Sequence, residues 1–295
     1  MHAPVRLVAI DMDGTLLASF AQQKVGDRTA RALRAAQAAG ITVAIATGRR
    51  VAYTAPLLNG HGLRDDTPLI TSNGAVTRSL DGTPIDHCHL DAAVARRLCG
   101  LLRGFGSLVF TFDRLGKGEL VLEDLAQAHE RITLWVEANR EAIEVVAPLE
   151  RAFEAGEDPI QGMVCGGLEG MKAAEKALRA SDLHARCECV RTEYSARNLS
   201  ILDLMPPGVT KGWALSRLAA RLGIDRKETM AIGDNWNDLN MLEWVAQPVL
   251  MANASLELRT LAGTRGWKQA PPNDQEGVAV ILERLLERQG AVVRA

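Results

Sequence analysis

Carboxylate side chains follow two short apolar runs of this 295-residue chain. Asp11 and Asp13 come after Leu7–Ile10, and Asp234 comes after Thr229–Ile232. Residues two apart in an extended chain point to the same side, so Asp11 and Asp13 can face one ligand. Nearby carboxylates repel each other unless a cation or a shared proton lies between them. Clustered carboxylate oxygens suit Mg²⁺, which often bridges to phosphate.

Two further side chains supply what a phosphate group needs. Thr47 follows the apolar run 41–46 and offers a hydroxyl donor, and Lys211 opens a predicted helix and offers a positive charge. A helix N-terminus also stabilises an anion placed beside it. With one carboxylate as nucleophile and another as acid and base, these groups are suited to phosphoryl transfer.

Strands that alternate with helices must bring these distant residues together. Continuous apolar runs indicate strands that are buried on both faces of a parallel sheet, as in α/β proteins. Ligands bind such sheets beyond the carboxyl ends of the strands. The expected strands are 7–10, 41–46, 68–71, 199–203, 229–232 and 248–251. The expected helices are 27–39 with Asp27 as N-cap, a helix before residue 59, 211–222 and 276–289.

The alternation is less regular in the middle of the chain. We expect strands at 108–112, 120–122 and 160–164, and helices at 91–102 and 169–180. This mixture predicts an inserted α+β domain over residues 82–197. The parallel-sheet domain is then discontinuous and comprises residues 1–81 and 198–295.

Composition excludes several classes of function. The net charge is −2 and aromatic residues make up 4% of the chain, so we expect no nucleic-acid partner. Neither a membrane span nor a signal peptide is expected, and the predicted location is cytoplasmic. The five cysteines are an odd number, and Cys187–Cys189 lacks a second pair that would complete a zinc site.

Four motifs in order resemble those of the haloacid dehalogenase superfamily of phosphatases, in its Cof-like branch with a large inserted cap (type IIB). They are Asp11-Met12-Asp13-Gly14-Thr15-Leu16, Thr47-Gly48-Arg49, Gly208-Val209-Thr210-Lys211-Gly212, and Gly233-Asp234-Asn235-Trp236-Asn237-Asp238. Ser72–Ala75, Asn253-Ala254 and the segment from Asn273 to Ala279 also fit that branch. The resemblance covers about residues 5–80 and 198–290, and it implies a Rossmann-like core with helices on both faces and a C2-type cap.

The resemblance also implies roles for the acidic residues. Asp11 attacks phosphorus and ligates Mg²⁺. Asp13 serves as general acid and then as base, and its backbone carbonyl binds the metal. Asp234 is the third protein ligand of the metal, and Asp238 supports the metal ligands without contacting the metal itself.

The remaining motif residues are expected to bind phosphate or to serve the fold. The resemblance assigns the phosphoryl oxygens to Thr47, Gly48, Lys211 and Asn237. Taken alone, the segment Thr47-Gly48-Arg49 is otherwise expected to cap a helix, and Arg49 to form a surface ion pair. Trp236, which departs from the common pattern of the fourth motif, is expected to pack against its neighbours, with a wall near the substrate as the alternative.

The predicted function is therefore Mg²⁺-dependent hydrolysis of a small phosphorylated metabolite. The resemblance favours a sugar phosphate, while a phosphoglycerate-type compound, flavin mononucleotide and pyridoxal phosphate remain open. Two alternatives also remain: a phosphomutase of the same superfamily, and a regulatory or binding protein that keeps the fold without turnover. We expect a monomer or a homodimer.

Overall fold

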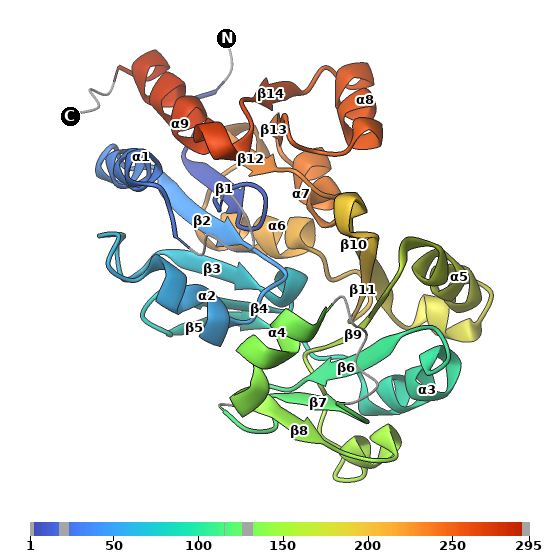
Figure 1. The fold of residues 1–295 in the computed structure, drawn as a ribbon. Coiled ribbons are helices and arrows are strands. Elements are labelled where there is room, and N and C mark those ends of the chain that lie inside the picture. The colour runs from blue at the N-terminus through green and yellow to red at the C-terminus, as the bar shows by residue number, and fades with distance from the viewer. Residues whose placement is uncertain (1–2, 18–23, 115, 126–131, 291–295) are drawn as a thin grey trace. The chain divides into compact units, whose positions relative to one another are not determined.

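The computed structural model describes residues 3–17, 24–114, 116–125 and 132–290. The chain forms two compact units (Figure 1). We call Met1–His87 with Thr210–Ala295 the larger unit and Cys88–Val209 the inserted unit. The domain boundaries expected from the sequence, after residues 81 and 197, lie earlier in the chain than these.

An eight-stranded sheet forms the larger unit, in the order β14-β13-β12-β1-β2-β3-β4-β5. Pairing is parallel from β14 to β3, and β4 and β5 join antiparallel. The strands are β1 (Leu7–Asp11), β2 (Thr42–Ala46), β3 (Pro68–Thr71), β4 (Val76–Ser79), β5 (Pro84–His87), β12 (Thr229–Gly233), β13 (Gln247–Met251) and β14 (Lys268–Ala270). The lower boundary moves to residue 87 because β5 still pairs with this sheet.

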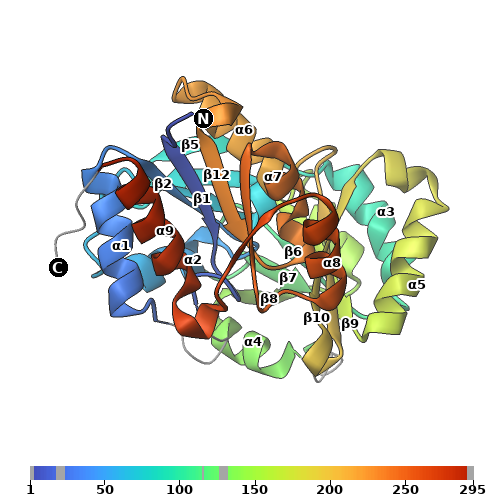
Figure 2. The same cartoon turned by 90° about the horizontal axis from the view of Figure 1, so that it is seen from above.

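Helices cover both faces of this sheet, as the α/β prediction requires. They are α1 (Asp27–Ala38), α2 (Val51–Leu58), α6 (Lys211–Arg221), α7 (Leu239–Trp244), α8 (Leu256–Thr264) and α9 (Gly277–Arg288). Figure 2 shows α1 and α9 on one side of β1 and β12, and α6 and α7 on the other. The expected α/β class is confirmed.

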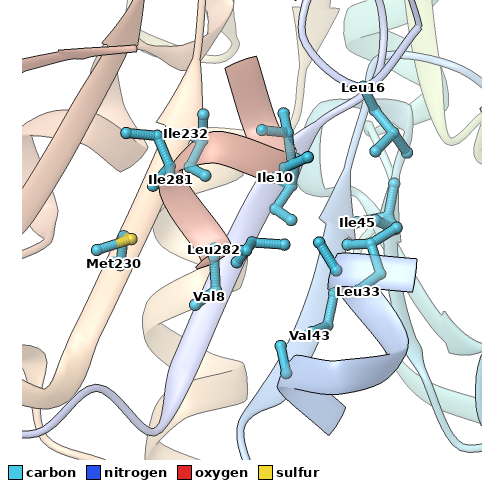
Figure 3. Close-up of a cluster of buried hydrophobic side chains, with 14 of the residues drawn as sticks. Val8, Ile10, Leu16, Leu33, Val43, Ile45, Met230, Ile232, Ile281 and Leu282 are labelled. Carbon is cyan, nitrogen blue, oxygen red and sulfur yellow. The ribbon is translucent and has the colours of Figure 1, made fainter. Parts of the chain in front are cut away.

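The apolar cluster under α1 and α9 fixes the position of the central strand (Figure 3). Val8 and Ile10 of β1 are fully buried there, beside Leu33 of α1 and Leu282 of α9. Burying one such aliphatic side chain stabilises a fold by about 1.5–3 kcal/mol. Since β1 lies between β12 and β2, this cluster holds the carboxyl ends of three neighbouring strands in one place.

One expected helix cap proved wrong. Asp27 is the first residue of α1, and Gly26 occupies the N-cap position without a side-chain hydrogen bond. The carboxylate of Glu276 instead accepts a hydrogen bond from the backbone N–H of Thr29 at 3.2 Å. A residue from the far end of the chain thus does what the sequence assigned to a local side chain.

The inserted unit contains a six-stranded sheet in the order β10-β11-β9-β6-β7-β8. Its elements are α3 (Ala92–Leu102), β6 (Ser107–Thr111), β7 (Leu120–Leu122), α4 (Thr133–Ala138), β8 (Ile143–Val145), β9 (Gln161–Gly166), α5 (Leu168–Arg179), β10 (Glu188–Tyr194) and β11 (Leu199–Met205). Residues of α3 and α5 pack with one apolar face of the sheet, and α4 packs with the other.

The strand expected at 199–203 does not belong to the parallel sheet. It lies within β11, which pairs antiparallel with both β10 and β9. An apolar run predicts a strand buried on both faces, and such a strand occurs in either kind of sheet. The direction of β11 is set by its partner strands β9 and β10, so the prediction that residues 199–203 belong to the parallel sheet was wrong. The second domain boundary therefore moves to residue 209.

In the part of the chain that the structure describes, no helix has both the length and the hydropathy to cross a membrane.

Candidate active site

The expected functional residues of the larger unit converge at the carboxyl ends of neighbouring strands. Asp11 is the last residue of β1, Thr47 follows β2, and Asp234 follows β12. Lys211 is the first residue of α6, whose N-cap Thr210 accepts a hydrogen bond from the backbone N–H of Trp213 at 3.1 Å. The parallel topology thus gathers residues more than two hundred positions apart.

Lys211 is fully buried and joins two carboxylates. Its Nζ lies 2.5 Å from Oδ1 of Asp11 and 2.7 Å from Oδ1 of Asp238. Burial disfavours the ammonium form, but the charges of Asp11 and Asp238 outweigh burial and raise the pKa of Lys211 above its usual value. A lysine held in this way stays charged and cannot leave without exposing two buried carboxylates to each other.

Three buried carboxylates form a cluster around this lysine. One oxygen each from Asp11, Asp234 and Asp238 lies within 4.8 Å of the others. Burial raises the pKa of Asp11 to about 7, and the charge of Asp238 adds to that rise while Lys211 opposes it. Burial, followed by the charges of Asp11 and Asp238, also raises the pKa of Asp234. A divalent cation would relieve this repulsion.

Asp238 differs from the other two because hydrogen bonds engage both of its oxygens. Oδ1 accepts from Lys211, while Oδ2 accepts from the backbone N–H groups of Asp234 at 2.9 Å and Asn235 at 3.0 Å. Asp238 therefore fixes the backbone of the loop that carries Asp234. This geometry suits a supporting position more than a ligand position.

Gly14 allows the loop after β1 to approach Asp234 closely. It adopts a positive φ of 85°, and a Cβ atom there would lie 2.4 Å from Oδ2 of Asp234. The neighbouring Thr15 donates a hydrogen bond from Oγ1 to Oδ1 of Asp234 at 2.6 Å. A larger residue than glycine at position 14 would displace the carboxylate.

Arg49 pairs with the side chain of Asp13. Nε of Arg49 donates to Oδ2 of Asp13 at 2.7 Å, and Nη2 donates to Oδ1 at 2.5 Å. The side chains are only 9% and 16% exposed, so the expectation of a surface ion pair for Arg49 was wrong. The available signal was position, because Arg49 follows the strand beside β1 and its long side chain reaches the loop after β1.

Asn73 connects the residues expected to bind phosphate. Its backbone N–H donates to the carbonyl of Thr47 at 3.0 Å, and its Oδ1 accepts from Nδ2 of Asn237 at 3.1 Å. A Cβ atom on Gly48 would lie 3.1 Å from Nδ2 of Asn73. Sequence reasoning recorded Asn73 only as part of a resembling segment, although an asparagine in the left-handed region, at φ 49°, often marks a specialised turn.

Trp236 packs against the apolar cluster beneath α6, α7 and α8. This contact agrees with the packing role expected for it. Three further side chains of the fourth motif are buried in the same unit as Asp11, Thr47 and Lys211: Asp234, Asn237 and Asp238.

This arrangement combines a buried carboxylate next to a fixed positive charge, a second carboxylate held by a guanidinium, and a carboxylate cluster suited to a divalent cation. Those are the parts that phosphoryl transfer requires, because catalysis of that reaction rests on positioning and on stabilising negative charge.

Comparison with known proteins agrees with this chemistry. A family model for haloacid dehalogenase-like hydrolases matches residues 8–282. Phosphatase YwpJ of Bacillus subtilis is 30% identical, over 96% of this chain and 100% of that protein. 5-Amino-6-(5-phospho-D-ribitylamino)uracil phosphatase YwtE of the same species is 27% identical, over 97% of this chain and 100% of that protein.

Two further matches are a longer protein, of which this chain spans less than half, and a solved structure. The chain is 29% identical to the chloroplastic endoribonuclease YBEY of Arabidopsis thaliana and spans only 45% of that longer protein. Among solved structures, a haloacid dehalogenase-like hydrolase from B. subtilis superposes with a TM-score of 0.76 at 27% identity, over 96% of this chain and 100% of that one.

Proposed function

Since this chain belongs to the haloacid dehalogenase-like hydrolases, we propose that it hydrolyses a phosphate monoester in two steps through a covalent bond between Asp11 and phosphorus. The chain is a phosphatase of small phosphorylated metabolites, and YwtE is named as a phosphatase of one such compound. The observation that carries the proposed route is the contact of 2.5 Å between Nζ of Lys211 and Oδ1 of Asp11 inside a cluster of three buried carboxylates.

The carboxylate cluster fits a magnesium ion. Lys211 pairs with two of the three clustered carboxylates, Asp11 and Asp238, and burial makes the mutual repulsion of the three costly. Asp11, Asp234 and the backbone carbonyl of Asp13 would hold the ion, with Asp238 fixing the loop of Asp234. When bound, Mg²⁺ supplies positive charge that stabilises the transferring phosphoryl group.

In the first step, an Oδ atom of Asp11 forms a bond to phosphorus while the bond from phosphorus to the leaving oxygen breaks. Asp13 acts as the general acid in this step and gives a proton to the leaving oxygen. Lys211 is positioned to offset the negative charge near Asp11. Thr47, Gly48 and Asn237, which Asn73 links, are proposed to bind the phosphoryl oxygens.

In the second step, water attacks phosphorus and the bond between Asp11 and phosphorus breaks. Asp13, now a carboxylate, takes the proton from that water. Inorganic phosphate is released, and both side chains return to their starting states. The bidentate contact of Arg49 orients the Asp13 carboxylate beside the loop that carries it.

We propose a sugar phosphate or sugar-alcohol phosphate as the substrate. The name of YwtE, a relative over nearly the whole chain, describes a phosphate on a ribityl chain. Three further points stay predictions. Residues 88–209 are proposed to form a cap that selects the substrate. The chain is proposed to be a monomer or a homodimer, and its proposed location is the cytoplasm.

A panel of phosphorylated metabolites tests this proposal. The purified protein is incubated with each compound, with Mg²⁺ or with a chelator, and released phosphate is measured. We expect phosphate release that depends on Mg²⁺, with sugar phosphates among the preferred compounds. Isomer formation without phosphate release would indicate a phosphomutase, and binding without turnover would indicate a regulatory protein.

A further inference from the structure

Two asparagines outside the four motifs hold the loop that carries Asp13. Nδ2 of Asn253 donates to the carbonyl of Gly14 at 2.8 Å, and Oδ1 of Asn253 accepts from the backbone N–H of Asn273 at 3.0 Å. Nδ2 of Asn273 in turn donates to the carbonyl of Leu17 at 2.9 Å. The two amides thus form a continuous bridge across residues 14–17.

We propose that Asn253 and Asn273 are positioning residues that keep Asp13 aligned for proton transfer, an inference that rests on the proposed function. Asp13 and Leu17 form a β-bridge, so the carbonyl that Asn273 holds belongs to the residue paired with Asp13. On the other side of the loop, Thr15 is bonded to Asp234. Loss of the amide bridge would remove the contacts on the carbonyls of Gly14 and Leu17 and leave the loop held by the bond of Thr15 to Asp234 and by the pair of Arg49 with Asp13.

The bridge is itself anchored to the body of the larger unit. Asn253 follows β13, and Asn273 opens a short 3-10 helix, Asn273–Gln275, that leads into α9. Glu276, in the left-handed region at φ 52°, places its carboxylate on the backbone N–H of Thr29 in α1. At Gly277 a Cβ atom would lie 2.0 Å from the carbonyl of Pro271. Only glycine fits there, so this segment has one tightly defined path.

Asn253 and Asn273 can affect the position of the loop without taking part in the chemistry. Neither asparagine carries a group that donates or accepts the catalytic proton, and their bonds to the loop end on backbone carbonyls. If they act by aligning Asp13, their loss should matter most where the leaving oxygen needs a proton. In that first step, esters whose leaving group departs as a stable anion should be affected little, while the second step needs Asp13 as base for either ester.

The test compares phenyl phosphate with 4-nitrophenyl phosphate, which differ mainly in how well the leaving phenolate carries negative charge. In Asn253→Ala we expect kcat/KM, which reports the first step alone, to fall about tenfold more for phenyl phosphate than for 4-nitrophenyl phosphate. The side chain of Asn253 is exposed, so this variant should melt at nearly the wild-type temperature. Asn253→Asp, which replaces the donor with an oxygen of similar size, should show the same selective loss.

Gln37→Ala is the matched control. The Gln37 amide also bridges two segments of the larger unit, through Oγ1 of Thr67 at 2.7 Å and the backbone N–H of Arg64 at 3.1 Å, but it does not contact residues 13–17. We expect a lower melting temperature and an unchanged ratio of kcat/KM for phenyl phosphate to kcat/KM for 4-nitrophenyl phosphate. Equal losses of kcat/KM on both substrates in the Asn253 variants, or the same ratio change in Gln37→Ala, would overturn the positioning role while wild-type turnover upheld the proposed function. A wild-type protein that releases no phosphate from any ester would overturn both.

Discussion

Arg49 engages both carboxylate oxygens of Asp13 through parallel hydrogen bonds of 2.7 Å and 2.5 Å. A guanidinium fork matches a carboxylate in this way and fixes its orientation, which a lysine cannot do. The pair connects the loop after β1 with the segment after β2, so it links the expected acid and base to the segment expected to bind phosphate.

We predict that Arg49→Lys lowers kcat about tenfold and that this loss disappears in an Asp13→Asn background, because Arg49 acts through Asp13. Steady-state kinetics on 4-nitrophenyl and phenyl phosphates measure both effects. Arg64→Ala is the control, since Arg64 makes a similar fork with Asp66 but both side chains are more than 60% exposed. Independent, additive losses for Arg49→Lys and Asp13→Asn would contradict this role.

A second prediction concerns the metal and needs no turnover. Mg²⁺ should raise the melting temperature of the wild-type protein, by an amount that corresponds to about 2.7 kcal/mol at a hundredfold excess over the dissociation constant. Asp234→Asn should lose this rise. Without Mg²⁺ the variant should melt at or above the wild-type temperature, because one of three buried, mutually repelling carboxylates has become neutral.

Asp182→Asn is the control for this measurement, because Asp182 is an exposed partner of Arg97 in the inserted unit. We expect its response to Mg²⁺ to match that of the wild type. An undiminished Mg²⁺-dependent rise in Asp234→Asn would show that the ion binds elsewhere.

The positions of the site residues show which parts of the site could be predicted from the sequence. Asp11, Thr47 and Asp234 each follow an apolar run, and the ends of parallel strands meet at one edge, so their convergence was predictable. The direction of β11 was not, because Leu199–Asp203 is equally suited to a central strand of either sheet. The position of Arg49 after the strand beside β1 was a usable signal for its contact with Asp13, whereas the bridge of Asn253 and Asn273 depends on side-chain reach between segments far apart in the chain, which spacing does not encode.

A third prediction concerns the pH dependence of stability at the edge of the large sheet. Asp86 of β5 accepts a hydrogen bond from Nε of Arg217 in α6 at 2.5 Å, and this bond lowers the pKa of Asp86 below its usual value of 3.8. A lowered folded-state pKa stabilises the protein at any pH above the unfolded value. That contribution is lost as the pH falls through the folded-state pKa.

Asp86→Asn should therefore lower the free energy of unfolding by about 0.5–1 kcal/mol at pH 7, a modest value because Arg217 is partly exposed. The difference from wild type should shrink steadily once the pH is below 3.8. Urea unfolding at a series of pH values gives this difference directly. A deficit that grows on acidification would have the wrong sign for this pair.

The bond between Asp11 and phosphorus is the step on which the proposed mechanism depends, and it can be trapped. Asp13→Asn should still accept a phosphoryl group from 4-nitrophenyl phosphate, whose leaving group needs no proton, but should lose it slowly because the base for water is missing. Acid quenching, proteolysis and mass spectrometry then locate the phosphoryl group. We predict that it lies on Asp11 in Asp13→Asn and is absent when Asp11→Asn is added; turnover that persists in Asp11→Asn, or a phosphoryl group found on another residue, would contradict the mechanism.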